Sequence, residues 1–306
     1  MVAVVGPWAK DKLDKLGRYL EYYTTVLKNQ AWCRTIYVDA FAGGGRAIVR
    51  QGNSKSVPET GIPLFDDEIP EVQEQTEFLD GSPRVALAIT NPFARYVFIE
   101  PDPERSAELR ALEEEIEGGR NVTVLETDAA SGIRWVLSQK IGRNSHRGVA
   151  FLDPFGARLE WESVAALAEL GIFEVVINFA LNMAIKRMLP NDGIVPPRWS
   201  ETLDRYFGTH EWYDEVYILQ GDDLFGSPHF RKREDYGDRL LALYRRRLEE
   251  AFGFVSTPRL IRNTRDVPLY YLIWAGPNKK GQQGANYILQ MGEPAARKRP
   301  SRGRDR

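Results

Sequence analysis

The chain has 306 residues, with 41 lysines and arginines against 43 acidic residues, three histidines and one cysteine. This length allows one large α/β domain or two modest ones, and the near-neutral charge excludes a general polyelectrolyte binder, so any contact with nucleic acid depends on local patches. Because Cys33 is the single cysteine and the histidines lack metal-ligand spacing, we expect no disulfide and no metal site.

The chain also lacks the sequence signals of a membrane or exported protein. No apolar run approaches the roughly 20 residues that span a bilayer. The first residues, "MVAVVGPWAKDK", do not have the order of a signal peptide. We therefore expect a cytoplasmic protein that makes no membrane contact.

Helical spacing of apolar residues predicts an amphipathic helix over residues 8–29. Short apolar strands are then expected at 35–41, 95–102, 121–128, 148–155 and 173–180, with helical patterns between them. This alternation indicates an α/β fold with a mostly parallel sheet covered on both faces. Right-handed crossovers bring the carboxyl ends of the strands to one edge, where open α/β sheets bind ligands.

Two segments interrupt the alternation within a single expected domain that spans residues 1–292. Residues 51–80 are polar and acidic and predict an inserted surface loop, whereas residues 181–235 predict a helical elaboration. A long helix follows, and the segments 258–266 and 269–276 are expected to pair as an antiparallel hairpin. The basic tail, 293–306, lacks the apolar residues of a core and is predicted to be disordered.

The first predicted strand ends in "DAFAGGG", residues 39–45. Glycine-rich loops at this position bind dinucleotides, mononucleotides or S-adenosylmethionine, because the ligand can lie against bare backbone. The dinucleotide spacing G-x-G-x-x-G and the Walker sequence are both absent. What remains is Asp-x-Phe-x-Gly-x-Gly, formed by Asp39, Phe41, Gly43 and Gly45. The alternative is a plain tight turn between a strand and a helix.

Acidic residues end the second and third strands. We predict that Glu100 accepts hydrogen bonds from ribose hydroxyls, the role of an acid at this place in nucleotide-binding sheets. The alternative is a cap on the following helix, which we expect of Asp102. Asp128 is placed either to contact an adenine amino group or to cap the next helix.

The fourth strand ends in "FLDPFG", residues 151–156. Pro154 removes a backbone donor, which leaves nearby carbonyls and the Asp153 carboxylate to accept from a planar amino group. Phe155 is placed to stack on a base, a contact worth about 1–3 kcal/mol. The alternative is that Phe155 belongs to the hydrophobic core.

Taken in order, Asp-x-Phe-x-Gly-x-Gly, "GSP" at 81–83, "FIEPD", "DPFG" and "INF" resemble the motifs of the three-Cys-motif partner family, over most of residues 8–290. That family is similar to class I S-adenosylmethionine-dependent methyltransferases. The resemblance implies a Rossmann-like fold with a seven-stranded sheet and a C-terminal antiparallel hairpin. It also implies a bound S-adenosylmethionine. The ribose of this cofactor would lie at Glu100, its adenine at Asp128, and its methionine end at the motif formed by Asp39, Phe41, Gly43 and Gly45. The target of methyl transfer would lie at Asp153, Pro154 and Phe155.

The resemblance also bears on activity. In ribosomal RNA adenine-N6 methyltransferases, an Asp-Pro-Pro-aromatic motif holds the target amino group, which favours methyl transfer to a base nitrogen of RNA or DNA. This chain has Asp-Pro-Phe-Gly, with the aromatic residue in place of the second proline. The alternative is therefore a non-catalytic cofactor-binding partner of a companion protein with a three-cysteine motif similar to that of radical S-adenosylmethionine enzymes. A nicotinamide-dependent oxidoreductase is disfavoured by the glycine spacing.

Overall fold

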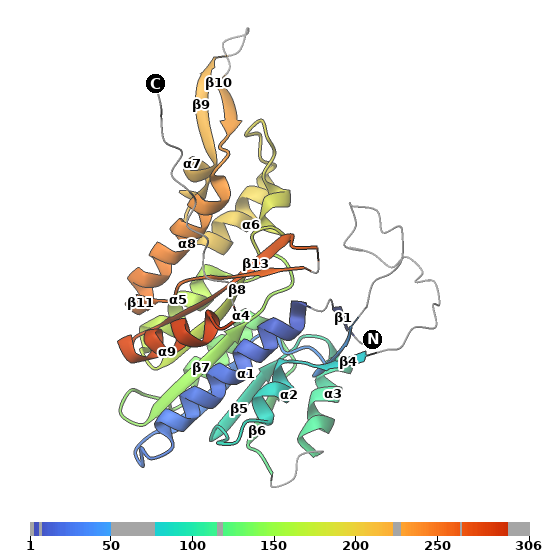
Figure 1. Ribbon diagram of the computed structural model, residues 1–306, viewed down its shortest axis with the longest axis vertical. Helices are drawn as coiled ribbons and strands as arrows, with labels where there is room; N and C mark the ends of the chain where they lie inside the picture. The colour runs from blue at the N-terminus through green and yellow to red at the C-terminus, as the bar shows by residue number, and fades with distance from the viewer. Residues whose placement is uncertain are drawn as a thin grey trace.

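A computed structural model of the chain describes residues 3–5, 8–49, 77–114, 119–222, 228–263 and 265–292 (Figure 1). Its main sheet has eight strands in the order β11-β13-β8-β7-β2-β5-β6, with β12 paired to β13. These strands are β2 (Arg34–Asp39), β5 (Arg95–Ile99), β6 (Val122–Leu125), β7 (His146–Leu152), β8 (Phe173–Phe179), β11 (Phe254–Val255), β12 (Arg259–Arg262) and β13 (Pro268–Gly276).

Strand direction follows the predicted pattern. The five strands β6, β5, β2, β7 and β8 are parallel neighbours. Strand β13 pairs antiparallel with β8 and forms the expected terminal hairpin with β12. The predicted mostly parallel sheet is therefore confirmed. It has one strand more than expected, because the nine-residue β13 is long enough to pair with β11 as well as with β12.

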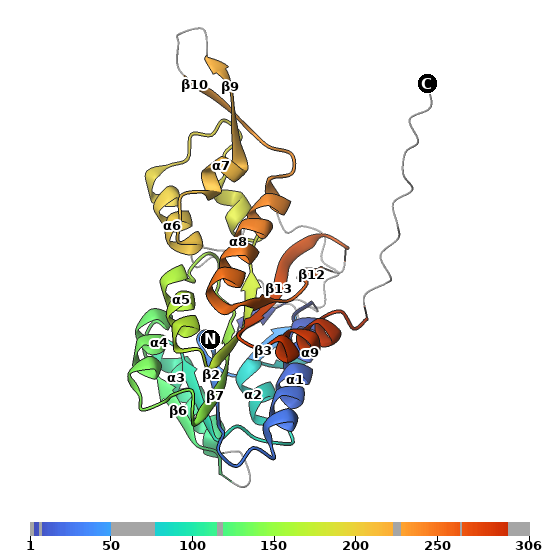
Figure 2. The ribbon, with the colours of Figure 1, turned by 90° about the vertical axis from the view of Figure 1, so that its left-hand side faces the viewer.

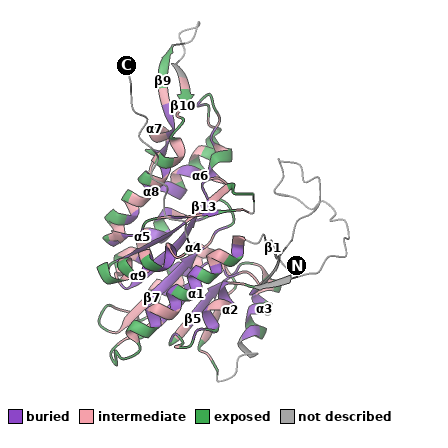
Figure 3. Cartoon of the chain, in the orientation of Figure 1, coloured by how far each residue is buried: buried purple, intermediate pink, exposed green. Residues whose placement is uncertain are grey.

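Helices cover both faces of the sheet, as Figure 2 shows with α1, α2 and α9 on one side and α4 and α5 on the other. Every residue of β8 is buried, and Figure 3 shows that burial is concentrated in the strands and in the helix faces turned to them. The helices are α1 (Trp8–Leu27), α2 (Ser82–Leu87), α3 (Pro103–Glu114), α4 (Ala129–Ser138), α5 (Trp161–Leu170), the 3₁₀ helix η1 (Ile185–Met188), α6 (Pro197–Phe207), α7 (Trp212–Val216), α8 (Tyr236–Phe252) and α9 (Lys279–Leu289).

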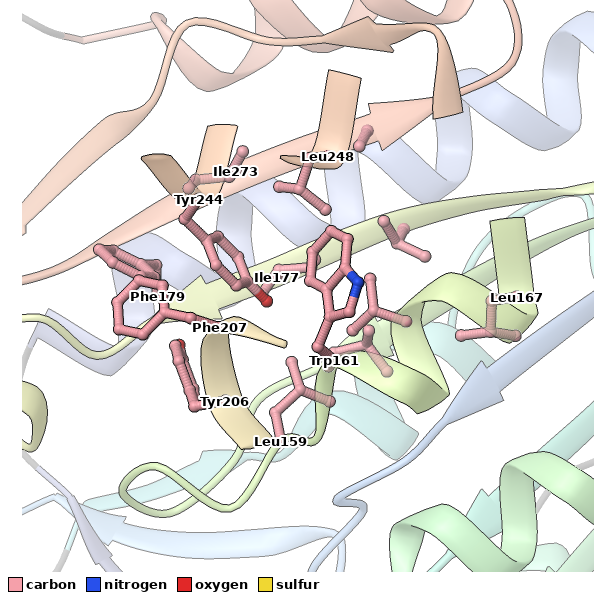
Figure 4. Packing of buried hydrophobic residues seen from close by; sticks show 14 of the residues in the cluster. Leu159, Trp161, Leu167, Ile177, Phe179, Tyr206, Phe207, Tyr244, Leu248 and Ile273 are labelled. Carbon is pink, nitrogen blue, oxygen red and sulfur yellow. The ribbon is translucent and has the colours of Figure 1, made fainter. Parts of the chain in front are cut away.

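An aromatic cluster anchors the elements that follow the fifth parallel strand (Figure 4). The ring centroid of Tyr244 on α8 lies 4.9 Å from that of Phe179, 5.5 Å from that of Tyr206 and 5.7 Å from that of Trp161. Buried aromatic pairs of this kind contribute about 0.5–1.5 kcal/mol beyond their area. The cluster joins α5, α6 and α8 to the end of β8, and so fixes the carboxyl edge of the sheet.

Two insertions differ in part from the sequence predictions. A small sheet, formed by β1 (Ala3–Val5), β3 (Arg46–Val49) and β4 (Glu77–Asp80), includes the last four residues of the segment predicted as a loop. The expected helical elaboration at 181–235 holds η1, α6 and α7 but also the antiparallel pair β9 (Tyr217–Asp222) and β10 (Pro228–Lys232), which extends beyond the main domain (Figure 1). Most of the predicted loop, 51–76, and the tail, 293–306, lie outside the described residues.

Candidate functional site

The glycine-rich loop leaves the end of β2 at the carboxyl edge of the sheet. The amide of Ala42 donates to the carbonyl of Ile99 over 3.1 Å, which holds the start of the loop against β5. Gly43 and Gly45 have φ of 62° and 78°, in the left-handed region that favours glycine. A Cβ at Gly43 would meet no heavy atom within 4 Å. One side of this loop is therefore open to a ligand.

The chain after the loop enters β3 and not a helix, so the alternative of a plain strand–helix turn is wrong. The β3–β4 pair instead returns the chain to the loop, where the amide of Gly81 donates to the carbonyl of Gly45 over 2.9 Å. Helix α2 starts directly afterwards at Ser82, in the "GSP" motif. The motif and the glycine loop, about 40 residues apart in sequence, are thus in direct contact.

Asp39 lies beneath the loop with no exposed surface. Its Oδ1 accepts from the amide of Phe41 over 3.3 Å, its Oδ2 accepts from the hydroxyl of Tyr37 over 3.3 Å, and the Ser82 hydroxyl also bonds the carboxyl. Burial raises the pKa of Asp39 to about 7, against the lowering effect of these hydrogen bonds. The carboxyl therefore organises the loop and the "GSP" turn from below.

Glu100 connects the glycine loop to the end of β5. The residue is buried, with 6% of its surface exposed; Oε2 accepts from the Gly43 amide over 2.9 Å, and Oε1 accepts from the Asp102 amide over 3.0 Å. The helix cap is formed by Asp102, whose Oδ1 accepts from the Arg105 amide over 3.0 Å, as predicted. A carboxylate oxygen has two lone pairs, so each oxygen of Glu100 retains capacity to accept from a ligand hydroxyl.

Asp128 caps α4, which was one of its two predicted roles. Its Oδ1 accepts from the Ser131 amide over 2.9 Å, and this bond holds the pKa of Asp128 below its usual value. The side chain is exposed beside the same edge of the sheet. The adenine contact stays a prediction.

Asp153 lies past the end of β7 and is held from two elements. Its Oδ2 accepts from the Lys12 ammonium of α1, and its Oδ1 accepts from the Asn178 amide of β8 over 2.6 Å. The Lys12 Nζ also lies 5.6 Å from the ring centroid of Tyr270 on β13, a cation–π contact. Lys12 lies outside the sequence motifs described above. The signal for Asn178 was the "INF" motif at the end of the fifth parallel strand.

Two buried polar atoms beside Asp153 lack hydrogen-bond partners in the described part of the chain: Asn178 Oδ1 and the Tyr270 hydroxyl. Both side chains are more than nine-tenths buried. An unsatisfied buried polar group costs about 1–3 kcal/mol. Such groups at the ligand-binding edge of an α/β sheet indicate that a polar partner completes the site.

The neighbours of Asp153 in the "DPFG" turn have contrasting environments. Pro154 is buried, whereas Phe155 is 70% exposed. The alternative that placed Phe155 in the core is therefore wrong. An exposed aromatic ring at the carboxyl end of a central strand is available to stack on a planar ligand.

Other site types find no support in the part of the chain that the structure describes. Its His, Cys, Asp and Glu residues form no group that could hold a metal ion. Among its helices, none combines the length and the apolar character needed to cross a bilayer.

Comparisons with known proteins detect only distant likeness. No family model matches the sequence, and no curated protein matches it. Among solved structures, spermidine synthase from Thermotoga maritima is 9% identical, with a TM-score of 0.41 over 90% of this chain and 61% of the other. Protein LPL1258 from Legionella pneumophila is 14% identical, with a TM-score of 0.39 over 86% and 97%. Magnesium protoporphyrin IX methyltransferase from Synechocystis, solved with bound SAH, is 14% identical, with a TM-score of 0.35 over 87% and 86%.

Because these scores are low, we assign the fold from the strand order and directions in this chain. The order β6-β5-β2-β7-β8 corresponds to 3-2-1-4-5 of a doubly wound sheet, and an antiparallel strand, β13, follows β8. The chain therefore has a doubly wound, Rossmann-like α/β fold.

Proposed function

We propose that the protein binds S-adenosylmethionine at the carboxyl edge of its sheet and transfers the methyl group to a base nitrogen of RNA or DNA. The observation on which the proposal rests is the convergence at this edge of the glycine loop, Glu100 and the Asp153 cluster, which consists of Asp153, Lys12, Asn178 and Tyr270. The sequence resemblance to three-Cys-motif partner proteins supports the same conclusion.

The residues present fit the cofactor. Gly43 leaves open space beside backbone, and Glu100 lies against the amide of that glycine with lone pairs to spare. In the proposal, Gly43 and Gly45 lie along the methionine end, Glu100 accepts from the ribose hydroxyls and Asp128 contacts the adenine. Bound there, S-adenosylmethionine supplies an electrophilic methyl group on a sulfonium.

The Asp153 cluster favours a nitrogen as the methyl acceptor. The Lys12 ammonium already occupies one oxygen of Asp153 as an N–H donor, and Asn178 Oδ1 is an acceptor without a partner among the described residues. A planar amino group carries two N–H bonds, so it matches a pair of neighbouring acceptors. In the proposal, the target amino group displaces Lys12 and donates to Asp153 and Asn178.

Positioning is what these residues contribute to the reaction. The lone pair of an exocyclic amino group is delocalised into its ring, and acceptors for both hydrogens favour a pyramidal nitrogen whose lone pair is aimed at the methyl carbon. Bound S-adenosylmethionine would supply the methyl carbon to this nitrogen, with its thioether as the leaving group, and Asp153 or water would take the proton that the nitrogen loses. Correct placement of two reactants lowers such a barrier by several kcal/mol.

Phe155 supports a base as the carrier of that nitrogen. Enzymes that modify bases hold the target outside the stack, between hydrogen bonds and an aromatic face. An exposed ring adjacent to Asp153 provides that face. Asp-Pro-Phe-Gly thus offers a stacking residue one position earlier than Asp-Pro-Pro-aromatic does.

The test is incubation with radiolabelled S-adenosylmethionine and separate pools of RNA, DNA and protein. We expect label in RNA or DNA, and we expect Phe155→Ala to lose at least about four-fifths of it, because one stacked base is worth about 1–3 kcal/mol. Tyr287→Ala is the matched control, because Tyr287 is 71% exposed on α9 and is not among the residues assigned to the site. Label found only in protein or in a small molecule contradicts the proposed substrate class.

A second function follows from the Lys12 contact. Both oxygens of Asp153 are already engaged, which favours a cofactor-binding partner of a three-cysteine-motif companion that performs no transfer itself. A pull-down distinguishes the two. If the protein is an adaptor, Asp153→Asn still holds the companion protein and still supports the protein's function in cells. If the protein is an enzyme, Asp153→Asn loses its function in cells, although any complex with the companion persists.

A further inference from the structure

A hollow lies at the edge of the sheet opposite the candidate site, where β8 begins and β13 ends. It has a volume of about 270 Å³ and is lined by the second half of α1, the chain before β8 and the start of α9. Glu174, which lines it, is four residues before Asn178 on the same face of β8. At about 3.3 Å per residue, roughly 13 Å of strand separates the two sites.

Glu174 provides a buried acceptor in this hollow. The side chain is 8% exposed, and its Oε2 accepts from the Tyr19 hydroxyl and, over 3.3 Å, from the indole N–H of Trp274. No donor among the described residues reaches Oε1, which faces Gly281 of α9 so closely that a Cβ there would lie 2.6 Å away. Burial raises the pKa of Glu174 to about 7, so a cationic partner would favour its ionised form.

Three tyrosines of α1 line the hollow together with Glu174. The ring centroid of Tyr19 lies 6.2 Å from that of Tyr22 and 6.3 Å from that of Tyr23, and all three line the hollow. The Tyr23 hydroxyl is buried and has no partner in the described part of the chain. Aromatic faces next to a carboxylate form a site that suits an ammonium group.

The outer part of the hollow carries the opposite charge. Lys280 is exposed at the start of α9, and Arg147 stacks on Trp32 with 4.7 Å between its guanidinium carbon and the ring centroid. The first turn of a helix adds a partial positive charge. These groups disfavour a simple cation and favour a ligand whose outer end is an anion. Apolar lining comes from Val26, Leu27 and Ile172.

We propose that this hollow is a binding site for a small zwitterion, an amino acid with an apolar side chain. The ammonium group lies at Glu174 among the tyrosines, the carboxylate lies toward Lys280 and Arg147, and the side chain packs on the apolar lining. This assignment gives every charged group of the hollow a partner of the opposite sign, and it does not depend on the function proposed for the other edge.

The first test is calorimetry with L-leucine and its two singly charged analogues, isoamylamine and isocaproate. We expect leucine to bind and each analogue to bind at least about tenfold more weakly, a difference of about 1.4 kcal/mol. Isoamylamine that binds as tightly as leucine contradicts the zwitterion. If neither leucine nor L-phenylalanine gives a heat of binding, the proposed site is wrong.

Variants separate this site from the other edge. Glu174→Gln and Lys280→Glu are expected to weaken leucine binding about tenfold or more, since each loses one charged contact. Lys279→Glu is the matched control, because the neighbouring lysine is exposed but does not line the hollow. Glu100→Ala is expected to keep leucine binding, and thermal unfolding confirms that each variant is folded. Binding that survives Glu174→Gln but is lost in Glu100→Ala overturns the assignment.

Discussion

Replacing Asp39 with asparagine is expected to stabilise the protein more at pH 8 than at pH 5. Burial raises the pKa of Asp39 in the folded protein from 3.8 to about 7, whereas the unfolded chain keeps the ordinary value. Between these values the folded state binds more protons than the unfolded state, so the stability of the wild type falls as pH rises. The asparagine side chain of the variant does not titrate, so the variant escapes this loss.

The magnitude follows from the part of that window which the experiment covers. The pH range from 5 to the folded pKa of about 7 covers roughly two pH units. Each unit is worth about 1.4 kcal/mol, so the wild type loses about 3 kcal/mol of stability over this range. The carboxyl is fully buried, so no reduction for solvent screening is needed. Hydrogen-bond changes caused by the amide are the same at both pH values and cancel in the comparison. The titration of Glu174 is common to both proteins and cancels as well.

Urea unfolding of wild type and Asp39→Asn at pH 5 and pH 8 measures the effect. The variant's free energy of unfolding relative to wild type is expected to rise by about 3 kcal/mol between the two conditions. An equal difference at both pH values, or a larger gain at pH 5, would refute a buried carboxyl that titrates near neutrality.

Three further predictions concern the same edge. A double-mutant cycle between Lys12→Met and Asp153→Asn is expected to give a coupling of about 1–2 kcal/mol in urea unfolding, because the pair is partly buried; a coupling near zero contradicts the contact. Gly45→Ala is expected to lower the free energy of unfolding by about 1–2 kcal/mol because of its positive φ, whereas Gly142→Ala, with open space and no positive φ, stays near zero. The stability that Asp128 contributes as a cap is present above its unfolded pKa and lost as pH falls, so Asp128→Asn is expected to cost more at pH 7 than at pH 3, and a pH-independent cost contradicts the cap.

The sequence was sufficient to predict the five parallel strands and the edge of the sheet that holds the candidate site. Strand and helix periods are local properties, and parallel topology then brings Asp39, Glu100 and Asp153 to one edge. Asp128 shows the limit of that reasoning, since a cap and an adenine contact require the same position at the start of a helix.

What could not be predicted depends on tertiary packing. Lys12 meets Asp153, 141 residues later, because α1 crosses the sheet at a particular angle, which apolar spacing does not specify. The same crossing places Tyr19, Tyr22 and Tyr23 over the other edge. The exposure of Phe155 was equally undetermined, since an aromatic residue after a strand suits either the core or a binding surface.

The central claim is that this edge binds S-adenosylmethionine, and calorimetry with S-adenosylmethionine and its demethylated product tests it most directly. We expect both to bind the wild type, and Glu100→Ala to weaken binding at least about tenfold, since hydrogen bonds to a charged group are worth about 1.5–3 kcal/mol. Glu162→Gln, an exposed change on α5, is expected to leave binding unchanged, and thermal unfolding shows that both variants are folded. No heat with the wild type, or equal binding by a folded Glu100→Ala, contradicts the claim.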